Sequence, residues 1–543
     1  MSRSTDFESP EIRDAVRLVS AALAASDYRR AYEIAEAALG RGAIHPALFS
    51  ARALWLEQQK RDEDALADFE RAASLAPKNT AILNAIGLCL TRLHRLDEAV
   101  SAFEEAIASN TTYTPSYHRK GIALGMAGNF AAARRAHEQA IKLNPRDTEA
   151  LANLASIAAR NGETKKALDY AQRALKLDPR QATAIAAQTL VANSQGRFAE
   201  AEQLARPLLD RSGLAASARA VLLGLLADAL DGQERVADAF QAYGEANECL
   251  RRLHAPRFSG LRSATDFTRD LVAHFQAAPP GPPVTSSAAA PCRHVFLLGF
   301  FRSGTTLLGQ VLASHPDIVT LEERDFLLDQ AASYLSDASG LARLATLTDD
   351  EAAEERDAYW RRIADSGIAL EGKVLVDKQP LNTIKLPLIA KLFPDAKIVF
   401  AVRDPRDVML SCFRRQFEIN AAMFDLLTLD GAAAFYDAVM QLAEVMQRAH
   451  EQPFFLHRYE DMIADFDGRI TALCDYLSVP FSPAMREFYA TASALDIRSP
   501  SASQVTRELY SQGVGQWRRY RDQLAPIFPV LAPWISEYGY PPE

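Results

Sequence analysis

A glycine-containing loop at residues 299–308, GFFRSGTTLL, has the residue types of an anion-binding site. It follows the apolar run from Val295 to Leu298 and precedes the helical pattern TTLLGQVLASHP. Glycine lets the backbone turn its N–H groups towards a ligand, and the first turn of a helix adds unpaired donors with a partial positive charge. The sequence therefore predicts a strand, a loop for phosphate or sulfate, and a helix. An ordinary turn between a strand and a helix is the alternative.

The loop differs from the nucleotide P-loop at one important position. In the motif G-x-x-x-x-G-K-[ST] a lysine reaches the β- and γ-phosphates of a triphosphate, but Thr305 stands at that place here. Arg302 puts a planar guanidinium inside the loop instead. A triphosphate is therefore a poor candidate, whereas a phosphosulfate fits backbone donors, an arginine and nearby hydroxyl groups. The other residues that would hold it are Ser303, Gly304, Thr305 and Thr306.

Length and composition limit the classes of protein. At 543 residues the chain exceeds what one hydrophobic core usually organises, so we expect at least two domains. A net charge of −9 argues against a partner that is nucleic acid or an anionic membrane. The 5 scattered cysteines have no metal-ligand spacing, and no run approaches the roughly 18 apolar residues of a membrane span. We therefore expect a cytoplasmic protein that needs no metal.

The first half of the chain repeats with a period of 34 residues and resembles the tetratricopeptide repeat, a pair of antiparallel helices per unit. Six units are readable, and GQERVADAFQAYGEA matches a shifted seventh. Small residues recur because two helices cross closely there. The aligned alanines are Ala31, Ala65, Ala99, Ala133, Ala167 and Ala201, and a second column holds Ala53, Gly87, Gly121 and Ala155.

These repeats predict a helical solenoid over residues 1–276, followed by a linker rich in proline, serine and alanine at residues 277–292. The concave face of such a solenoid would bind a protein or peptide partner. A spacer or a dimerising scaffold is the alternative.

Residues 293–543 predict an α/β domain. Apolar runs at 373–378, 396–404 and 453–462 alternate with helical stretches, which favours a parallel sheet covered by helices. Ligands of such sheets bind beyond the carboxyl ends of the strands. The polar residues at those ends are Glu322 and Glu323, Asp377 and Lys378, Arg403 and Asp404, and Tyr459 and Glu460.

Four motifs of this half together resemble the sulfotransferases, and most of all the tyrosylprotein branch. They are GFFRSGTTLL, the pair Glu322–Glu323, VDKQP and VRDPRDVMLSCFRR. The resemblance covers roughly residues 293–540. It implies a P-loop-type α/β fold and the sulfuryl donor 3′-phosphoadenosine-5′-phosphosulfate, PAPS, as co-substrate.

The resemblance also implies which residues bind the donor. The loop from Arg302 to Thr306 would hold the 5′-phosphosulfate, while Arg403 and Ser411 would bind the 3′-phosphate. Arg415, four residues past Ser411, would face the same ligand if the segment is helical. Tyr459 matches a tyrosine that lies against the nucleotide, although a core tyrosine is the alternative. In the C-terminal segment, Gln504 belongs to a stretch that closes over PAPS in the family. Gln516 stands where the family has a lysine, so either Arg518 takes over its phosphate contact or that contact is lost.

Three residues would carry the chemistry. Glu323 matches the family's base for the acceptor hydroxyl, Lys378 its lysine at the bridging oxygen, and Ser501 a hydroxyl at the transition state. A helix-capping acidic pair and a surface lysine are the alternatives for Glu323 and Lys378. The branch's arginine two residues after the base is Asp325 here, so recognition of a peptide acceptor is open.

The sequence therefore predicts a sulfotransferase whose repeats present or select the acceptor. Tyrosine in a protein, a glycan hydroxyl and a small phenol all remain candidate acceptors. A nucleotide-dependent P-loop kinase and a non-catalytic repeat scaffold are the other two hypotheses.

Overall fold

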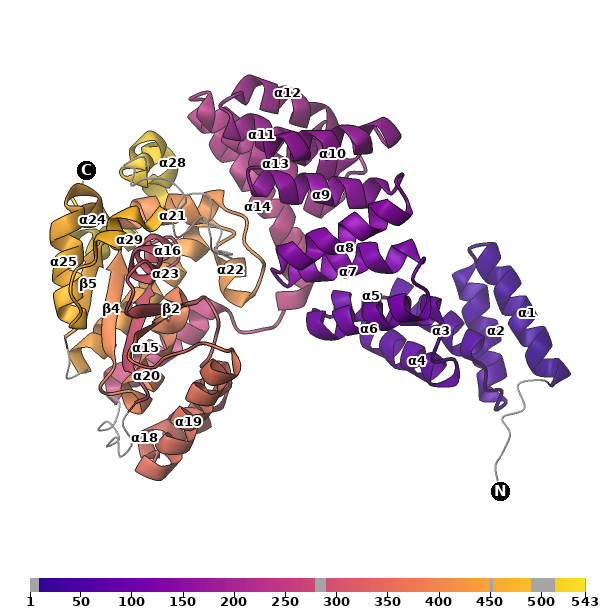
Figure 1. Cartoon of the computed structure of the whole chain (residues 1–543), viewed down its shortest axis with the longest axis horizontal. Coiled ribbons are helices and arrows are strands. Elements are labelled where there is room, and N and C mark those ends of the chain that lie inside the picture. Colours follow the sequence, from indigo (N-terminus) through magenta and orange to yellow (C-terminus); the bar gives the residue numbers. More distant parts are fainter. Residues whose placement is uncertain (1–8, 279–289, 450–452, 490–512, 543) are drawn as a thin grey trace. The chain divides into compact units, whose positions relative to one another are not determined.

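The structure is a computed structural model, and it describes residues 9–278, 290–449, 453–489 and 513–542. It divides into two compact units, residues 1–195 and residues 196–543. The first unit is built of helices, whereas the second combines helices with a five-stranded sheet (Figure 1). This confirms the predicted fold class, a helical solenoid followed by an α/β domain with a parallel sheet.

The first unit is a series of short helices that pack against one another in chain order. Asn79 and Asp147 accept hydrogen bonds from backbone N–H groups at the starts of two of them, as polar residues at helix N-caps commonly do. The helices are α1 (Pro10–Ala24), α2 (Tyr28–Gly40), α3 (Pro46–Gln58), α4 (Asp62–Leu75), α5 (Thr80–Arg92), α6 (Leu96–Ser109), α7 (Thr114–Met126), α8 (Phe130–Leu143), α9 (Thr148–Arg160), α10 (Thr164–Leu177) and α11 (Ala182–Ser194).

Small residues of the 34-residue register lie where the two helices of a repeat cross. A Cβ atom added to Gly87 of α5 would lie 2.6 Å from the ring of Phe103 in α6. The same atom on Gly121 of α7 would lie 2.6 Å from the ring of His137 in α8. Both distances are shorter than van der Waals contact, so a larger side chain would separate the helices. The predicted reason for these small residues is therefore confirmed.

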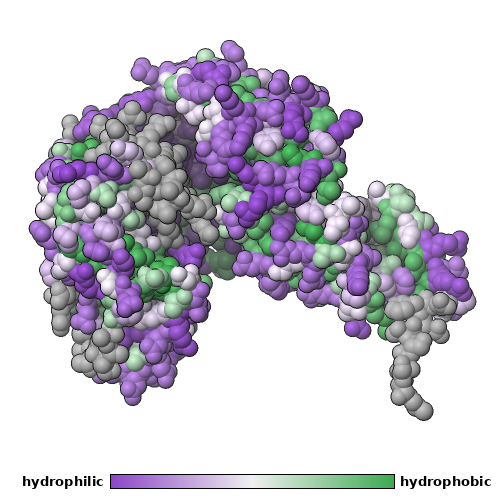
Figure 2. Space-filling view, viewed as in Figure 1, coloured by the Kyte–Doolittle hydropathy of each residue, from purple (hydrophilic) through white to green (hydrophobic). Residues whose placement is uncertain are grey.

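Hydrophilic side chains cover most of the visible surface of the first unit, with hydrophobic side chains in small areas between them (Figure 2). Across the residues that the structure describes, no helix has both the length and the apolar character needed to cross a membrane.

The second unit begins with four helices, and α13 and α14 complete the repeats. Ala239 of α14 is fully buried in the segment predicted as a shifted seventh repeat, and α13 and α14 pack closely against each other. The seventh helix pair is therefore confirmed. The four helices are α12 (Phe198–Leu209), α13 (Ala216–Gly232), α14 (Val236–Phe258) and α15 (Ala264–Ala277).

The sheet has five parallel strands in the order β2-β3-β1-β4-β5, so β1 lies in its centre. The strands predicted from four apolar runs are present, whereas β2, which includes Glu322, was indicated only by the acidic pair at its end. The strand predicted over 453–462 ends at Arg458, because the polar residues that follow form helix α24. The strands are β1 (Arg293–Gly299), β2 (Ile318–Glu322), β3 (Val374–Lys378), β4 (Lys397–Val402) and β5 (Phe455–Arg458).

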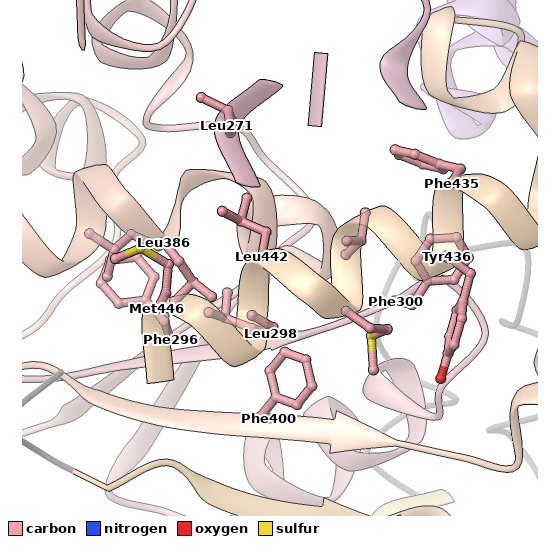
Figure 3. Close-up of a cluster of buried hydrophobic side chains, with 14 of the residues drawn as sticks. Leu271, Phe296, Leu298, Phe300, Leu386, Phe400, Phe435, Tyr436, Leu442 and Met446 are labelled. Atoms are coloured by element: carbon pink, nitrogen blue, oxygen red, sulfur yellow. The ribbon is translucent and has the colours of Figure 1, made fainter. Parts of the chain in front are cut away.

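Alternate residues of β1 face two layers of helices. Val295 and Leu297 pack with side chains of α16 and α25, whereas Phe296 and Leu298 pack with side chains of α20 and α23. Figure 3 shows the second layer, in which Leu271 of α15 belongs to the same buried cluster. The helices after β1 are α16 (Thr305–Ala313), α17 (Leu328–Tyr334), α18 (Ala338–Thr346), α19 (Asp349–Asp365), α20 (Leu386–Leu392), α21 (Pro405–Arg414), α22 (Ala421–Asp425), α23 (Leu429–Ala449), α24 (Tyr459–Ala464), α25 (Phe466–Leu477), α28 (Arg521–Leu524) and α29 (Phe528–Glu537), with 3₁₀ turns η1 (Pro380–Lys385), η2 (Pro483–Glu487), η4 (Gln516–Tyr520) and η5 (Ala525–Ile527).

The last repeat helices pack against the α/β domain, which differs from the predicted separation at residue 277. The side-chain amide of Asn247 in α14 donates to the carbonyl of Phe413 at 3.0 Å. The hydroxyl of Thr265 in α15 donates to Asp425 at 2.7 Å. Helices at the end of a solenoid have one face without a further repeat, and here α13 to α15 bury that face on the domain. Most of the predicted linker, residues 279–289, lies outside the described residues.

Two shortened chains test whether the second folding unit begins at residue 196 or at residue 277. A chain that begins at residue 196 should fold, because it keeps the whole second unit. A chain that begins at residue 277 loses Leu271, Val272 and Phe275, which are buried in the core of the domain. Each such side chain contributes about 1.5–3 kcal/mol, so this second chain should aggregate or unfold at a much lower temperature. Gel filtration measures aggregation, and thermal unfolding measures the unfolding temperature. A stable monomer of residues 277–543 would contradict the division at residue 196.

Packing inside the first unit can be tested at Gly87. We expect Gly87→Val to destabilise this unit by roughly 1–3 kcal/mol, the usual cost of overpacking, because the added carbons meet Phe103. Gly40→Ala is the matched control, since no atom lies within 4 Å of the position of its Cβ. Thermal unfolding followed by circular dichroism should show a lower midpoint for Gly87→Val alone. Equal midpoints would mean that the helices are not in close contact there.

Candidate active site

The loop after β1 joins the carboxyl edge of the sheet to the start of α16. Arg302 and Gly304 both have left-handed backbone conformations, with φ of +66° and +92°. Such conformations within a short loop turn neighbouring N–H groups towards one concavity, and the unpaired donors of the first helical turn follow directly. The strand, loop and helix predicted from the sequence are therefore present. Ser303, Thr305 and Thr306 are buried around the loop.

The strand order puts this loop at a topological switch point of the sheet. The chain leaves β1 towards β2 on one side, whereas it leaves β4 towards β5 on the other side. A crevice for a ligand forms where successive connections diverge in this way. The loops after β1 and β4 flank the switch point, and they carry Arg302 and Arg403.

Three residues from the predicted donor site meet beside the loop. The Nε atom of Arg302 donates to the hydroxyl of Ser411 in α21 at 2.9 Å. Nη1 of Arg403 donates to the backbone carbonyl of Arg302 at 3.1 Å. The loop after β1, the end of β4 and helix α21 thus hold two guanidinium groups and a hydroxyl together.

Tyr459, the first residue of α24, packs against both the loop and the arginine. A Cβ atom on Gly304 would lie 2.7 Å from the ring of Tyr459, so only glycine fits at this position. The guanidinium of Arg403 lies 5.0 Å from the centre of the same ring, within the range of a cation–π interaction. Tyr459 therefore belongs to this cluster, although it begins a helix instead of ending a strand.

The cluster has the properties of a phosphate site. Nε of Arg403 is buried and has no hydrogen-bond partner among the described residues. Buried polar groups are normally paired, and an anion would supply the acceptor that this donor lacks. The hydrogen bonds that Arg403 does make go to backbone carbonyls, and the buried carboxylate of Asp407 is near enough to interact with its charge.

Glu323 and Lys378 form an ion pair at the ends of adjacent strands. Oε1 of Glu323 lies 3.0 Å from Nζ of Lys378, and Lys378 is fully buried while 32% of the Glu323 side chain is exposed. The register of β2 and β3 sets this pairing, because the N–H of Glu323 donates to the carbonyl of Lys378 at 3.1 Å. Gly309 of α16 gives room to the lysine, whose Cε would lie 3.6 Å from a Cβ there.

Glu323 has a strained backbone, with φ of +35° in a residue that is not glycine. Conformations of this kind cost about 1–3 kcal/mol and persist where the surrounding structure fixes them. The residue thus leaves the strand at an angle that an ordinary strand end would not give. An exposed carboxylate beside a buried ammonium can accept a proton from a bound hydroxyl while the lysine faces a second anionic group.

Asp377 is buried on the opposite face of the sheet from its neighbour Lys378. Because side chains alternate along β3, Asp377 faces the helix layer opposite to the lysine. Tyr359 donates its hydroxyl to Asp377 at 2.9 Å, and Nε2 of His294 lies 3.0 Å from that hydroxyl. Burial raises the pKa of Asp377 to about 7 and lowers the pKa of His294 to about 3. The alternation of VLVDK was the only signal in the sequence for this buried network.

The described part of the C-terminal segment contacts Arg403 after β4 and Asp407 in the first turn of α21. Asp407 accepts hydrogen bonds from the N–H groups of Gly515 and Trp517 at 2.6 Å and 2.8 Å. Arg403 donates to the carbonyl of Gly513. Arg518 is exposed, and its guanidinium lies 5.3 Å from the Trp517 ring. This segment therefore borders the arginine cluster.

Some predicted site residues are placed differently or lie outside the description. Ser501 and Gln504 fall in residues 490–512, outside the described residues, as does the side chain of Glu322. Arg415 follows the last residue of α21, so the helical spacing that would bring it beside Ser411 ends one residue too early. Asp325 forms an ion pair with Lys385, a partner that the sequence did not indicate.

Comparisons with known proteins give two family matches. The sulfotransferase family matches residues 294–483, and the tetratricopeptide repeat matches residues 63–114 and 118–182. An uncharacterised protein of Aquifex aeolicus is 26% identical over 61% of this chain, which spans only 44% of that protein's length. A putative protein-tyrosine sulfotransferase of Caenorhabditis briggsae is 25% identical over 45% of this chain and 88% of its own.

The repeats are also similar to a solved structure. A tetratricopeptide repeat protein from Parabacteroides merdae covers 44% of this chain and 94% of its own length, with 16% identity and a TM-score of 0.38. Residues 294–483 of this chain are thus similar to the sulfotransferase family, and the segments similar to the tetratricopeptide repeat precede them.

Proposed function

We propose that the second unit transfers a sulfuryl group from PAPS to a hydroxyl acceptor. The observation that carries the proposal is the ion pair of Glu323 with the buried Lys378, at the same edge of the sheet as the loop with Arg302. A base for a hydroxyl and a cation for a leaving phosphate are the two groups that this chemistry needs. The family match and the relative from Caenorhabditis briggsae, named as a putative protein-tyrosine sulfotransferase, support it.

The donor would lie along the switch point of the sheet. The backbone N–H groups from Arg302 to Thr306 would hold its 5′-phosphosulfate, and Arg403 with Ser411 would hold the 3′-phosphate. The short distance between Arg302 and Ser411 supports this division, because one ligand could then touch both residues. Tyr459 would lie beside the nucleotide. Arg518, in the C-terminal segment, would contact a phosphate of the donor.

The proposed reaction has a simple balance. The acceptor oxygen forms a bond to sulfur while the bond from sulfur to the bridging oxygen breaks, and that oxygen keeps the electron pair on the departing phosphate. Glu323 takes the proton of the acceptor hydroxyl. Lys378 stabilises the negative charge that develops on the bridging oxygen. The acceptor must therefore approach from the exposed side of Glu323.

Charges beside Glu323 bear on the acceptor. Asp325 is neutralised by Lys385, and Arg324 is exposed next to the base. A hydroxyl on a protein or peptide that carries acidic residues would complement Arg324, and the repeats of the first unit would present it. We also propose that the protein is cytoplasmic. Its five cysteines are unpaired, and free thiols persist in reducing compartments.

Nucleotide binding separates this proposal from a kinase and from a scaffold. Isothermal titration should detect 3′-phosphoadenosine-5′-phosphate, PAP, in the presence of a chelator. Labelled PAPS with a cell lysate should then transfer label to protein. Binding of ATP that requires magnesium, without binding of PAP, would favour a kinase, and PAP binding without transfer would favour a scaffold.

We expect Arg302→Ala and Arg403→Ala each to weaken PAP binding. Each change removes charge-assisted hydrogen bonds to an anion, which contribute about 1.5–3 kcal/mol, or roughly 10- to 150-fold in Kd. Arg293→Ala is the matched control, since Arg293 lies at the opposite end of β1 and bonds to carbonyls of Leu477 and Ser478. Calorimetric affinities within a few fold of wild type in both site variants would refute the donor site.

Glu323→Gln should lower turnover by roughly 10²–10⁴-fold, the usual contribution of a general base, with little change in PAP affinity. The amide keeps the shape and can still accept a hydrogen bond from Lys378. The loss should be smallest with phenols that arrive partly ionised, because they need no base. Lys378→Met should instead slow all acceptors. Near-normal turnover of Glu323→Gln with an un-ionised alcohol would show that the base is another residue.

A further inference from the structure

Asp231, in the last turn of helix α13, contacts three residues of the α/β domain. Its carboxylate lies 2.7 Å from Nη2 of Arg414, and the hydroxyl of Tyr520 donates to it at 2.7 Å. Nη2 of Arg519 also lies 3.0 Å from it. A residue of the last repeat thus joins the end of α21 to the C-terminal segment.

The position of Asp231 is unfavourable for the helix alone. The end of a helix carries partial negative charge, so a carboxylate in the last turn of α13 is repelled by it. Only 12% of its side chain is exposed, and water therefore screens it little. The guanidinium groups of Arg414 and Arg519 compensate this charge. The residue serves the contact with the domain and not the stability of its own helix.

Arg414 joins Asp231 to the helix that carries Ser411. It is the last residue of that helix, α21. The rings of Tyr243 and Tyr520 lie 5.4 Å and 5.8 Å from its guanidinium, and Asp231 holds one end of the group. A guanidinium with aromatic rings and a carboxylate around it has little freedom to turn. The end of α21 is thereby fixed.

The other end of the same guanidinium holds the C-terminal segment. Nη1 of Arg414 donates to the side-chain oxygen of Gln516 at 3.1 Å. Gln516 follows Gly515, whose N–H is bound by Asp407 of α21. Gly513, two residues earlier, accepts from Arg403. One carboxylate of the repeats is therefore linked through Arg414 to helix α21 and to the C-terminal segment, two of the segments that lie beside Arg403.

We propose that Asp231 is a positioning residue for the 3′-phosphate of the donor. It holds Arg414, and through it Ser411 and the segment of Gln516, in the arrangement that the phosphate meets. This inference rests on the proposed function. It makes the last repeat part of the donor site, in addition to any role of the repeats in acceptor binding.

The test compares two nucleotides that differ only in the 3′-phosphate. PAP and AMP are titrated into the full chain, with AMP measured by competition, for wild type and Asp231→Asn. The expected result is a PAP Kd raised about tenfold, the effect of a weakened charge-assisted bond, and an AMP constant within about twofold of wild type. Asp231→Glu should recover most of the PAP affinity. Thr265→Val, which removes a hydrogen bond between α15 and Asp425, is the control and should change neither constant.

The outcomes separate this inference from the proposed function. If Asp231→Asn weakens the binding of PAP and of AMP equally, or changes neither affinity, the role of Asp231 is overturned, but the protein can still be a PAP-binding enzyme. Failure of wild type to bind PAP overturns both proposals. If Asp231→Asn does not fold, Tyr520→Phe removes a single hydroxyl from the same carboxylate, and it should weaken PAP selectively by about threefold. An unchanged PAP affinity of a folded Tyr520→Phe then counts against the inference.

Discussion

The guanidinium of Arg403 connects three segments that lie far apart in the sequence. It donates to the carbonyl of Arg302 in the loop after β1 and to the carbonyl of Gly513 near the C-terminus, and it lies over the ring of Tyr459. All three partners are neutral, and its Nε is buried without a hydrogen-bond partner in the described part of the chain. A positive charge held in this way attracts an anion. The loop after β1, helix α24 and the segment of Gly513 thus all contact this one side chain.

The sequence allowed the loop, the repeats and most strands to be predicted, because local patterns determine them. Glycines and an arginine after an apolar run indicated the turn at Arg302, and the period of 34 residues indicated the helix pairs. The strand β2 could not be predicted in the same way, since it is short and its apolar character is interrupted. Its pairing with β3, which brings Glu323 to Lys378, depends on a contact between distant segments.

The contacts of α13 to α15 were also beyond the reach of local patterns. Repeat helices have the same amphipathic character whether they pack on another repeat or on a different domain. Asp231 gives one signal in retrospect, because a carboxylate is disfavoured in the last turn of a helix. The burial of Asp377 follows from strand alternation, but its partners Tyr359 and His294 come from segments whose proximity only the structure reveals. Ser501 and Gln504 lie outside the described residues and stay predictions.

The most direct test of the account is a crystal structure of the chain grown with PAP. We expect the 5′-phosphate at the backbone N–H groups of residues 302–306, and the 3′-phosphate within hydrogen-bond distance of Ser411 and of Nε of Arg403. We also expect an open space between the 5′-phosphate and Glu323 that is large enough for a sulfuryl group and an acceptor hydroxyl. Density for PAP at another part of the chain, or with the 3′-phosphate in contact with Lys378 instead, would contradict it.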